Sequence, residues 1–143
     1  MAQEVKLRIC GMQIQGGGEE DKVEVVSVGK MYEEDGAVCV SYEEMTDENE
    51  TGIVHVVRNL LKVQDNQVEV IKRGTSESHM VFVPEQATYT YYSTPIGELE
   101  VSIFTKQIER EQMSNGFRLV LQYDLEMNQT MISQCNVDIT VEQ

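Results

Sequence analysis

Three polar side chains stand where the alternation of the sequence would turn them toward a hydrophobic core, and a fourth is grouped with them as a candidate. Lys72 and Thr105 each continue the phase of alternating aliphatic residues, Tyr123 lies among leucines, and the fourth, Tyr92, lies within the strand-like run 87–93. A buried hydroxyl or ammonium group needs a hydrogen-bond partner. These groups therefore either satisfy one another at the ends of strands or present hydrogen bonds to a bound molecule, and they form the candidate ligand-binding set.

Other residue types that perform chemistry are scarce and scattered. The two histidines, His55 and His79, fall in different strand-like runs beside valine or methionine. No H-E-x-x-H, G-x-S-x-G or phosphate-loop pattern occurs. The acidic run 47–50 lacks the ligand spacing and turning glycine of an EF-hand, which favours a hydrated loop. We therefore predict no catalytic residue, no metal and no cofactor. An enzyme would need a pocket that gathers Lys72 or a histidine with a carboxylate.

The cysteines point to a reducing compartment. Cys10, Cys39 and Cys135 are odd in number and form no C-x-x-C pair, and two of them occupy alternating, strand-like positions. Such cysteines usually act as small buried apolar residues. Residues 1–15 contain Glu4 and no continuous apolar segment, so no signal peptide is visible. The prediction is a cytoplasmic protein.

The length of the chain indicates one domain, and its charge restricts the kinds of binding partner. The 143 residues match one domain, residues 1–143, and 41% hydrophobic content is ordinary for a globular chain. The formal net charge of −14 repels phosphate backbones and anionic membrane surfaces. No apolar run approaches the roughly 20 residues that span a bilayer. Nucleic acid and membranes are therefore unlikely partners by charge.

The last third of the chain carries the clearest structural pattern. From 117 to 127 and again from 131 to 141, apolar and polar residues alternate with a period of two. Folding the two runs about Gln129 places apolar residues on one face, and a one-residue slip would expose them. The pairs expected from this fold are Leu125 with Ser133, Tyr123 with Cys135, Leu121 with Val137 and Leu119 with Ile139.

Short extended runs separated by polar turns fill the remainder, giving about ten strands. A phase shift across Gly11 suggests a bulge, and residues 109–116 look like a longer connection, with at most one helical turn within 107–113. Sequential strands with short turns favour an all-β, single antiparallel up-and-down β-barrel, in which an even number of strands lets the first and last pair. A two-sheet sandwich with open edges is the main alternative.

Strand number also bears on what a barrel could hold. Barrels of more than about eight strands have wider interiors, and this chain has mid-sized inward residues and no tryptophan. Unless the barrel is flattened, its interior could hold a small, partly apolar ligand. The alternative is a structural or interaction protein, such as a homodimer, that uses its outer face. Val120, Ile132 and Phe104 fall on otherwise polar outer faces and would form that patch.

From the second predicted strand onward, the chain resembles the YwiB-like bacterial family of unknown function, placed among the calycin-type β-barrels. The resemblance lies in Gly29-x-x-Tyr32, Ser41-Tyr42-Glu43-Glu44, Lys72-Arg73-Gly74, Phe82, Tyr92-x-Thr94-Pro95-x-Gly97-x-Leu99 with Thr105, and Tyr123-x-Leu125. It implies a calycin- or lipocalin-like barrel in a bacterial cytoplasmic protein and no known activity. Lipocalins carry a Gly-x-Trp that this chain lacks, so their ligands do not transfer to it.

Overall fold

The computed structural model describes residues 2–15, 18, 20–47, 54–74, 77–94, 97–127 and 130–143. Every regular element in these ranges is a β-strand. The strands are β1 (Gln3–Gln15), β2 (Glu20–Glu34), β3 (Ala37–Asp47), β4 (Val54–Gln64), β5 (Gln67–Gly74), β6 (Ser78–Phe82), β7 (Ala87–Thr94), β8 (Gly97–Met113), β9 (Gly116–Met127) and β10 (Thr130–Glu142). No helix in the described ranges is long and apolar enough to cross a membrane.

The strands form one antiparallel meander whose first and last members pair, as predicted. The order across the sheet is β6-β5-β4-β3-β2-β1-β10-β9-β8-β7. The hairpin of β9 and β10 has the expected register, with Tyr123 opposite Cys135 and Leu121 opposite Val137. The fold class is confirmed as an all-β, ten-stranded antiparallel barrel that is nearly closed.

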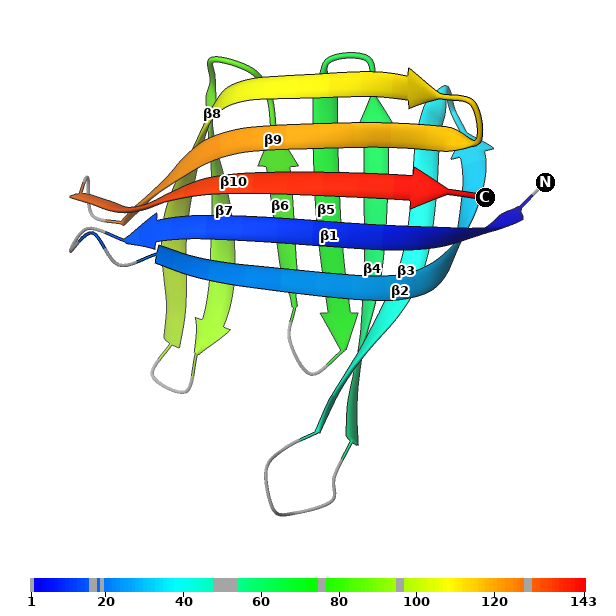
Figure 1. Cartoon of the computed structure of the whole chain (residues 1–143). Helices are drawn as coiled ribbons and strands as arrows, with labels where there is room; N and C mark the ends of the chain where they lie inside the picture. The colour runs from blue at the N-terminus through cyan, green and yellow to red at the C-terminus, as the bar shows by residue number, and fades with distance from the viewer. Residues whose placement is uncertain are drawn as a thin grey trace.

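The barrel is flattened into two layers whose strands cross (Figure 1). Strands β1, β9 and β10 run across the front, and β3 to β7 lie behind them. The two long strands β2 and β8 contribute to both layers, because each pairs with a front strand at one end and a back strand at the other. The flattening brings the inner faces of the two layers together, which fills the middle of the interior that the strand number suggested would be wide and leaves only the ends of the barrel for a ligand.

Among the described strands, the pairing around the barrel is interrupted only between β6 and β7, where the sequence suggested that neighbouring strands pair continuously. Pro84 follows β6 and has no N–H to donate, and the next residue, Glu85, has a positive φ of 63°. The chain turns there toward β8, so that Glu85 N donates to Thr105 O at 2.8 Å and Thr105 N donates to Gln86 O at 3.3 Å. These bonds, with one from the Thr88 hydroxyl to Val81 O, bridge the opening.

The expected long connection at 109–116 is wrong. Strand β8 continues to Met113, and only Ser114 and Asn115 form the turn to β9. The register shifts between Thr105 and Gln107, which leaves Lys106 as the extra residue of a β-bulge. Without the bulge, Glu109 and Glu111 would face the core, so the bulge turns two carboxylates outward. The predicted helical turn within 107–113 is absent for the same reason.

The predicted bulge at Gly11 is also wrong. Gly11 lies opposite Val23 on one side and Val137 on the other, and both ladders pass it without a register shift. Met12 and Ile14 therefore alternate with Gly11 and Gln13 and lie on the outer face. The apparent phase shift in the sequence comes from apolar residues on the outside of the barrel, not from an inserted residue.

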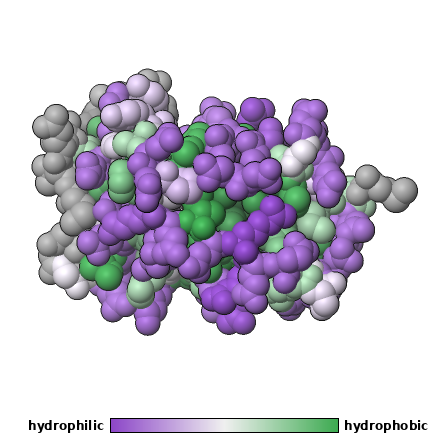
Figure 2. Space-filling view, turned by 90° about the horizontal axis from the view of Figure 1, so that it is seen from above, coloured by the Kyte–Doolittle hydropathy of each residue, from purple (hydrophilic) through white to green (hydrophobic). Residues whose placement is uncertain are grey.

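The centre of the barrel is filled by aliphatic side chains and phenylalanine. Leu7, Ile103 and Leu119 have no exposed surface, and Phe82 and Leu121 are 2% exposed. Both layers contribute to this single cluster. Figure 2 shows apolar side chains in the middle of the face seen from above, with hydrophilic side chains around them. The core is therefore central, and polar inward groups lie toward the ends.

Candidate functional site

The inward positions change from apolar to polar along most strands, and the change runs in one direction. In β1 the inward series begins at Val5 and reaches Gln13, whereas β10 begins at Ser133 and reaches Val141. The polar ends lie beside the connections that follow β1, β3, β5, β7 and β9. We call this region the polar half; its inward polar residues are Gln13, Asn59, Lys72, Thr90, Thr105, Tyr123, Ser133 and Cys135.

Three side chains of the polar half are buried without a hydrogen-bond partner among the described residues. Asn59 and Thr90 are 2% exposed, and Thr105 has no exposed surface. Both side-chain atoms of Asn59 and the hydroxyl oxygens of Thr90 and Thr105 lack a partner. Such groups are rare in folded proteins, because leaving one unsatisfied costs about 1–3 kcal/mol. They mark places where another molecule, water included, would be bound.

The front layer of the polar half is a row of connected polar side chains. Gln13 Nε2 donates to Ser133 Oγ at 2.9 Å, and Ser133 Oγ lies 3.8 Å from Cys135 Sγ. Burial raises the pKa of the Cys135 thiol, and hydrogen bonds with Ser133 and Tyr123 offset part of that effect. Cys135 is therefore a neutral thiol at neutral pH and a poor nucleophile.

The back layer of the polar half carries a second row of inward polar side chains. Tyr42, Asn59 and Lys72 lie directly opposite one another on β3, β4 and β5. Burial, with a smaller contribution from Glu44, raises the pKa of the Tyr42 hydroxyl, which keeps it a neutral donor. Lys72 Nζ lies 4.0 Å from Glu44 Oε1 in a half-exposed pair. Arg58 and Glu43 form a second ion pair at this end, with Nε and Oε1 3.8 Å apart.

The structure brings two of the four predicted site residues together. Thr105 and Tyr123 lie directly opposite each other on β8 and β9. The Tyr123 ring packs against Phe82 of the other layer, with centroids 4.8 Å apart. Lys72 lies on β5, next to Asn59 rather than beside that pair. The backbone of Tyr92 pairs with Leu99, and its side chain lies outside the described part of the structure.

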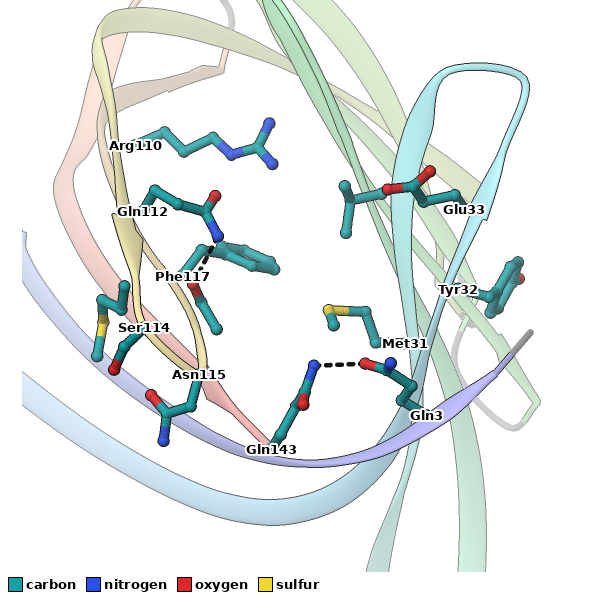
Figure 3. A pocket seen from close by; sticks show the side chains of 13 residues that line it. Gln3, Met31, Tyr32, Glu33, Arg110, Gln112, Ser114, Asn115, Phe117 and Gln143 are labelled. Carbon is teal, nitrogen blue, oxygen red and sulfur yellow. Dashed lines mark hydrogen bonds between the residues drawn. The ribbon is translucent and has the colours of Figure 1, made fainter.

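At the opposite end of the barrel, the inner faces leave a cleft of about 390 Å³. Its lining includes Met31, Glu33, Val38, Arg110, Gln112 and Phe117. Arg110 and Gln112 reach into it from β8, and Met31 and Glu33 lie on the wall formed by β2 (Figure 3). We call it the end cleft. The guanidinium carbon of Arg110 lies 5.5 Å from the centre of the Phe117 ring.

Sequence reasoning missed residues at both ends. Asn59 had a usable signal, because it interrupts the inward series of Val57, Leu61 and Val63. For Arg110, the sequence gives no sign of an inward position, because the bulge that turns this residue inward is not visible in the alternation of β8. The inward position of Arg110 follows from the pairing of β8 with β9, in which Arg110 lies opposite the buried Leu119.

The structure also places the residues considered for catalysis. His79 Nε2 lies 2.9 Å from Glu69 Oε1 on the exposed face of β5 and β6. The side chain of His55 and residues 48–50 of the acidic run lie outside the described residues. Among the residues described, no three His, Cys, Asp or Glu side chains are grouped as a metal site would require.

Comparison with known proteins identifies the family. Residues 7–139 match the model of a domain of unknown function, DUF1934. The chain is 26% identical over 129 residues to the uncharacterized β-barrel protein YwiB of Bacillus subtilis, covering 90% of this chain and 87% of that protein. The crystal structure of the B. subtilis ywiB protein superposes with a TM-score of 0.81 at 25% identity, covering 99% of this chain and 92% of that one. The predicted resemblance is confirmed: the chain belongs to the DUF1934 family of YwiB-like β-barrel proteins of unknown function.

Proposed function

We propose that the polar half of the barrel interior binds a small, partly apolar molecule. The observation that carries the proposal is the set of buried polar atoms on Asn59, Thr90 and Thr105 that have no hydrogen-bond partner among the described residues. Lys72, opposite Asn59, and Tyr123, opposite Thr105, complete the proposed site, and Tyr92 remains a member of it from the sequence. Thr105 belongs both to the set expected from the sequence and to the buried, unpartnered set.

The burial of these groups argues against a purely structural role. Polar residues near strand ends are common, because solvent usually satisfies them. Thr105 has no exposed surface and Asn59 and Thr90 are 2% exposed, so bulk solvent does not reach them. A barrel selected for stability alone would be improved by valine at the two threonine positions, because the shape is the same and the unsatisfied hydroxyl is gone.

The side chains define the chemistry of the ligand. An amide offers both donors and an acceptor, and each hydroxyl offers one donor and acceptor lone pairs. Lys72 is already near Glu44, so its charge is largely matched. A neutral molecule with hydroxyl, carbonyl or amide groups and an apolar part that meets Phe82 and Met80 of the core suits these groups better than an ion.

Ligand retention in native mass spectrometry tests this proposal. Protein purified from its native host is expected to carry a stoichiometric small molecule, and Thr105→Val is expected to lose it, because the hydroxyl that faces the ligand is removed. Thr88→Val is the matched control: Thr88 also lies on the inward series, but its hydroxyl donates to Val81 O within the protein. Bare protein from the host, or equal loss in both variants, would contradict the proposal.

A surface groove supports a second candidate, self-association. The outer face of β2, β1, β10 and β9 carries a groove of about 570 Å³, lined by Cys10, Met12, Val23 and Val120 with charged neighbours. Val120 belongs to the outer patch expected from the sequence; the Ile132 side chain is outside the described residues. Lys22, Glu24 and Asp138 bring both signs of charge to the groove. A second copy of this chain could therefore match it.

If the groove joins two copies, light scattering at high protein concentration should give twice the mass of 16.3 kDa. Added salt should favour the dimer, because it screens the repulsion between two chains of charge −14. Val120→Asp should be monomeric. Phe104→Asp is the control, since Phe104 is also an exposed outer residue, at 38%, but lies outside the groove. A monomer at every concentration and salt level would exclude this candidate.

A further inference from the structure

The end cleft contains a cation, Arg110, that has no anionic partner in the part of the chain that the structure describes. Arg110 lies on the inner face of β8, opposite the buried Leu119, and its side chain extends into the cleft (Figure 3). No carboxylate of the described residues lies within 4.0 Å of it. In contrast, Arg8, Arg58 and Arg118 each have a carboxylate at 3.3, 3.8 and 2.6 Å. Arg110 is thus an exposed guanidinium on an inward position of β8, in a chain with 25 acidic and 11 basic residues, that has no carboxylate partner among the described residues.

Three glutamine side chains that line the cleft with Arg110 are already partnered. Gln112 Nε2 donates to Gly116 O at 3.0 Å. Gln143 donates to the Gln3 side chain, which ties the C-terminal residue to β1 beside the cleft. These bonds hold the walls in place. No acceptor among the described residues is hydrogen-bonded to the five N–H donors of Arg110. The Phe117 ring beneath the guanidinium fixes one of its faces by a cation–π contact.

The opposite wall limits the charge and shape of an occupant. Met31 and Val38 are partly buried apolar residues that line the cleft, and Glu33 lies on the same wall as Met31. Glu33 repels a second negative charge, and the charge of the whole chain disfavours polyanions. One guanidinium is geometrically suited to bind one carboxylate through two parallel hydrogen bonds.

We propose that the end cleft binds a small organic monocarboxylate, with its carboxylate on Arg110 and its apolar body against Met31 and Val38. The cleft volume of about 390 Å³ lies within the usual range for small-molecule sites. The site is separate from the polar half, because the two lie at opposite ends of the barrel. Neither proposal depends on the other.

Methionine methyl groups report on the two ends separately. Met31 and Met113 line the end cleft, whereas Met80 lies on β6 next to the polar half. In the full chain with 13C-labelled methionine methyls, phenylacetate at millimolar concentrations is expected to shift Met31 and Met113 and leave Met80 unchanged. Phenylacetamide, which has the same shape without the charge, and phenyl phosphate, which is a dianion, are expected to bind at least about tenfold more weakly.

Arginine variants then assign the carboxylate to its partner. Arg110→Gln should weaken the binding of phenylacetate about tenfold or more. Arg110→Lys should recover only part of the affinity, because lysine keeps the charge but lacks the two parallel N–H donors of the guanidinium. Arg118→Gln removes the same charge from the neighbouring β9, where Arg118 pairs with Asp138, and should bind like the unmodified chain. An unchanged Met80 signal in each variant shows that the barrel is intact. Equal binding of acid and amide, an unaffected Arg110→Gln variant, or no shift at Met31 and Met113 would each overturn the proposal.

Discussion

Replacing Gly116 with alanine is expected to destabilise the protein by about 3 kcal/mol or more, which is a large part of the stability of a small domain. A Cβ atom at this position would lie 1.8 Å from Val141 O and 2.8 Å from Val141 C. Both are backbone atoms of β10, so no side chain can rotate away. The added methyl group would separate β9 from β10 where Gly116 pairs with Glu142. Urea unfolding followed by circular dichroism measures the loss.

Gly11→Ala is the matched control for Gly116→Ala. Gly11 also lies within a paired strand, but a Cβ there meets no atom within 4 Å. Alanine restricts the unfolded chain and should leave stability unchanged or raise it by up to about 1 kcal/mol. Similar destabilisation by both substitutions would mean that the loss of glycine in a strand matters more than the close approach of β10, and would contradict the steric account.

Replacing Asn59 with leucine is expected to raise the free energy of unfolding of the ligand-free protein by about 1–3 kcal/mol. Asn59 is 2% exposed, and neither its Nδ2 nor its Oδ1 has a partner among the described residues. Leucine has a similar size and needs no hydrogen bond, so the desolvation penalty disappears. The same variant should fail to retain the ligand proposed for the polar half, so stability and binding are expected to change in opposite senses.

Ser133→Ala is the control for the sign of that effect. Ser133 is as buried as Asn59, at 2%, but its hydroxyl oxygen accepts a bond from Gln13 Nε2 at 2.9 Å. Removing a hydrogen bond that is already made should lower the free energy of unfolding by about 0.5–1.5 kcal/mol. Urea midpoints at unchanged m-value decide between the two cases. A loss of stability in Asn59→Leu would contradict the account, because the amide would then be satisfied in the free protein.

The alternation in the sequence predicted most of the strands, their faces and much of their pairing, but not the second half of β8. Alternation with a period of two assigns each side chain to a face, and matching two such faces leaves one register, as in the pairing of Leu119 with Ile139. An even number of strands with short turns then places the first strand beside the last. These are local or nearest-neighbour properties, so they can be read along the chain.

Where the barrel opens and which polar groups are isolated became visible only in the folded chain. The bulge at Lys106 directly follows Thr105, whose backbone bonds with Glu85 and Gln86 lie beside the gap between β6 and β7. That bulge turns Arg110 into the end cleft. Whether Asn59 has a hydrogen-bond partner depends on what the opposite layer places against it. Both outcomes come from contacts between distant parts of the chain, which the alternation of one strand does not encode.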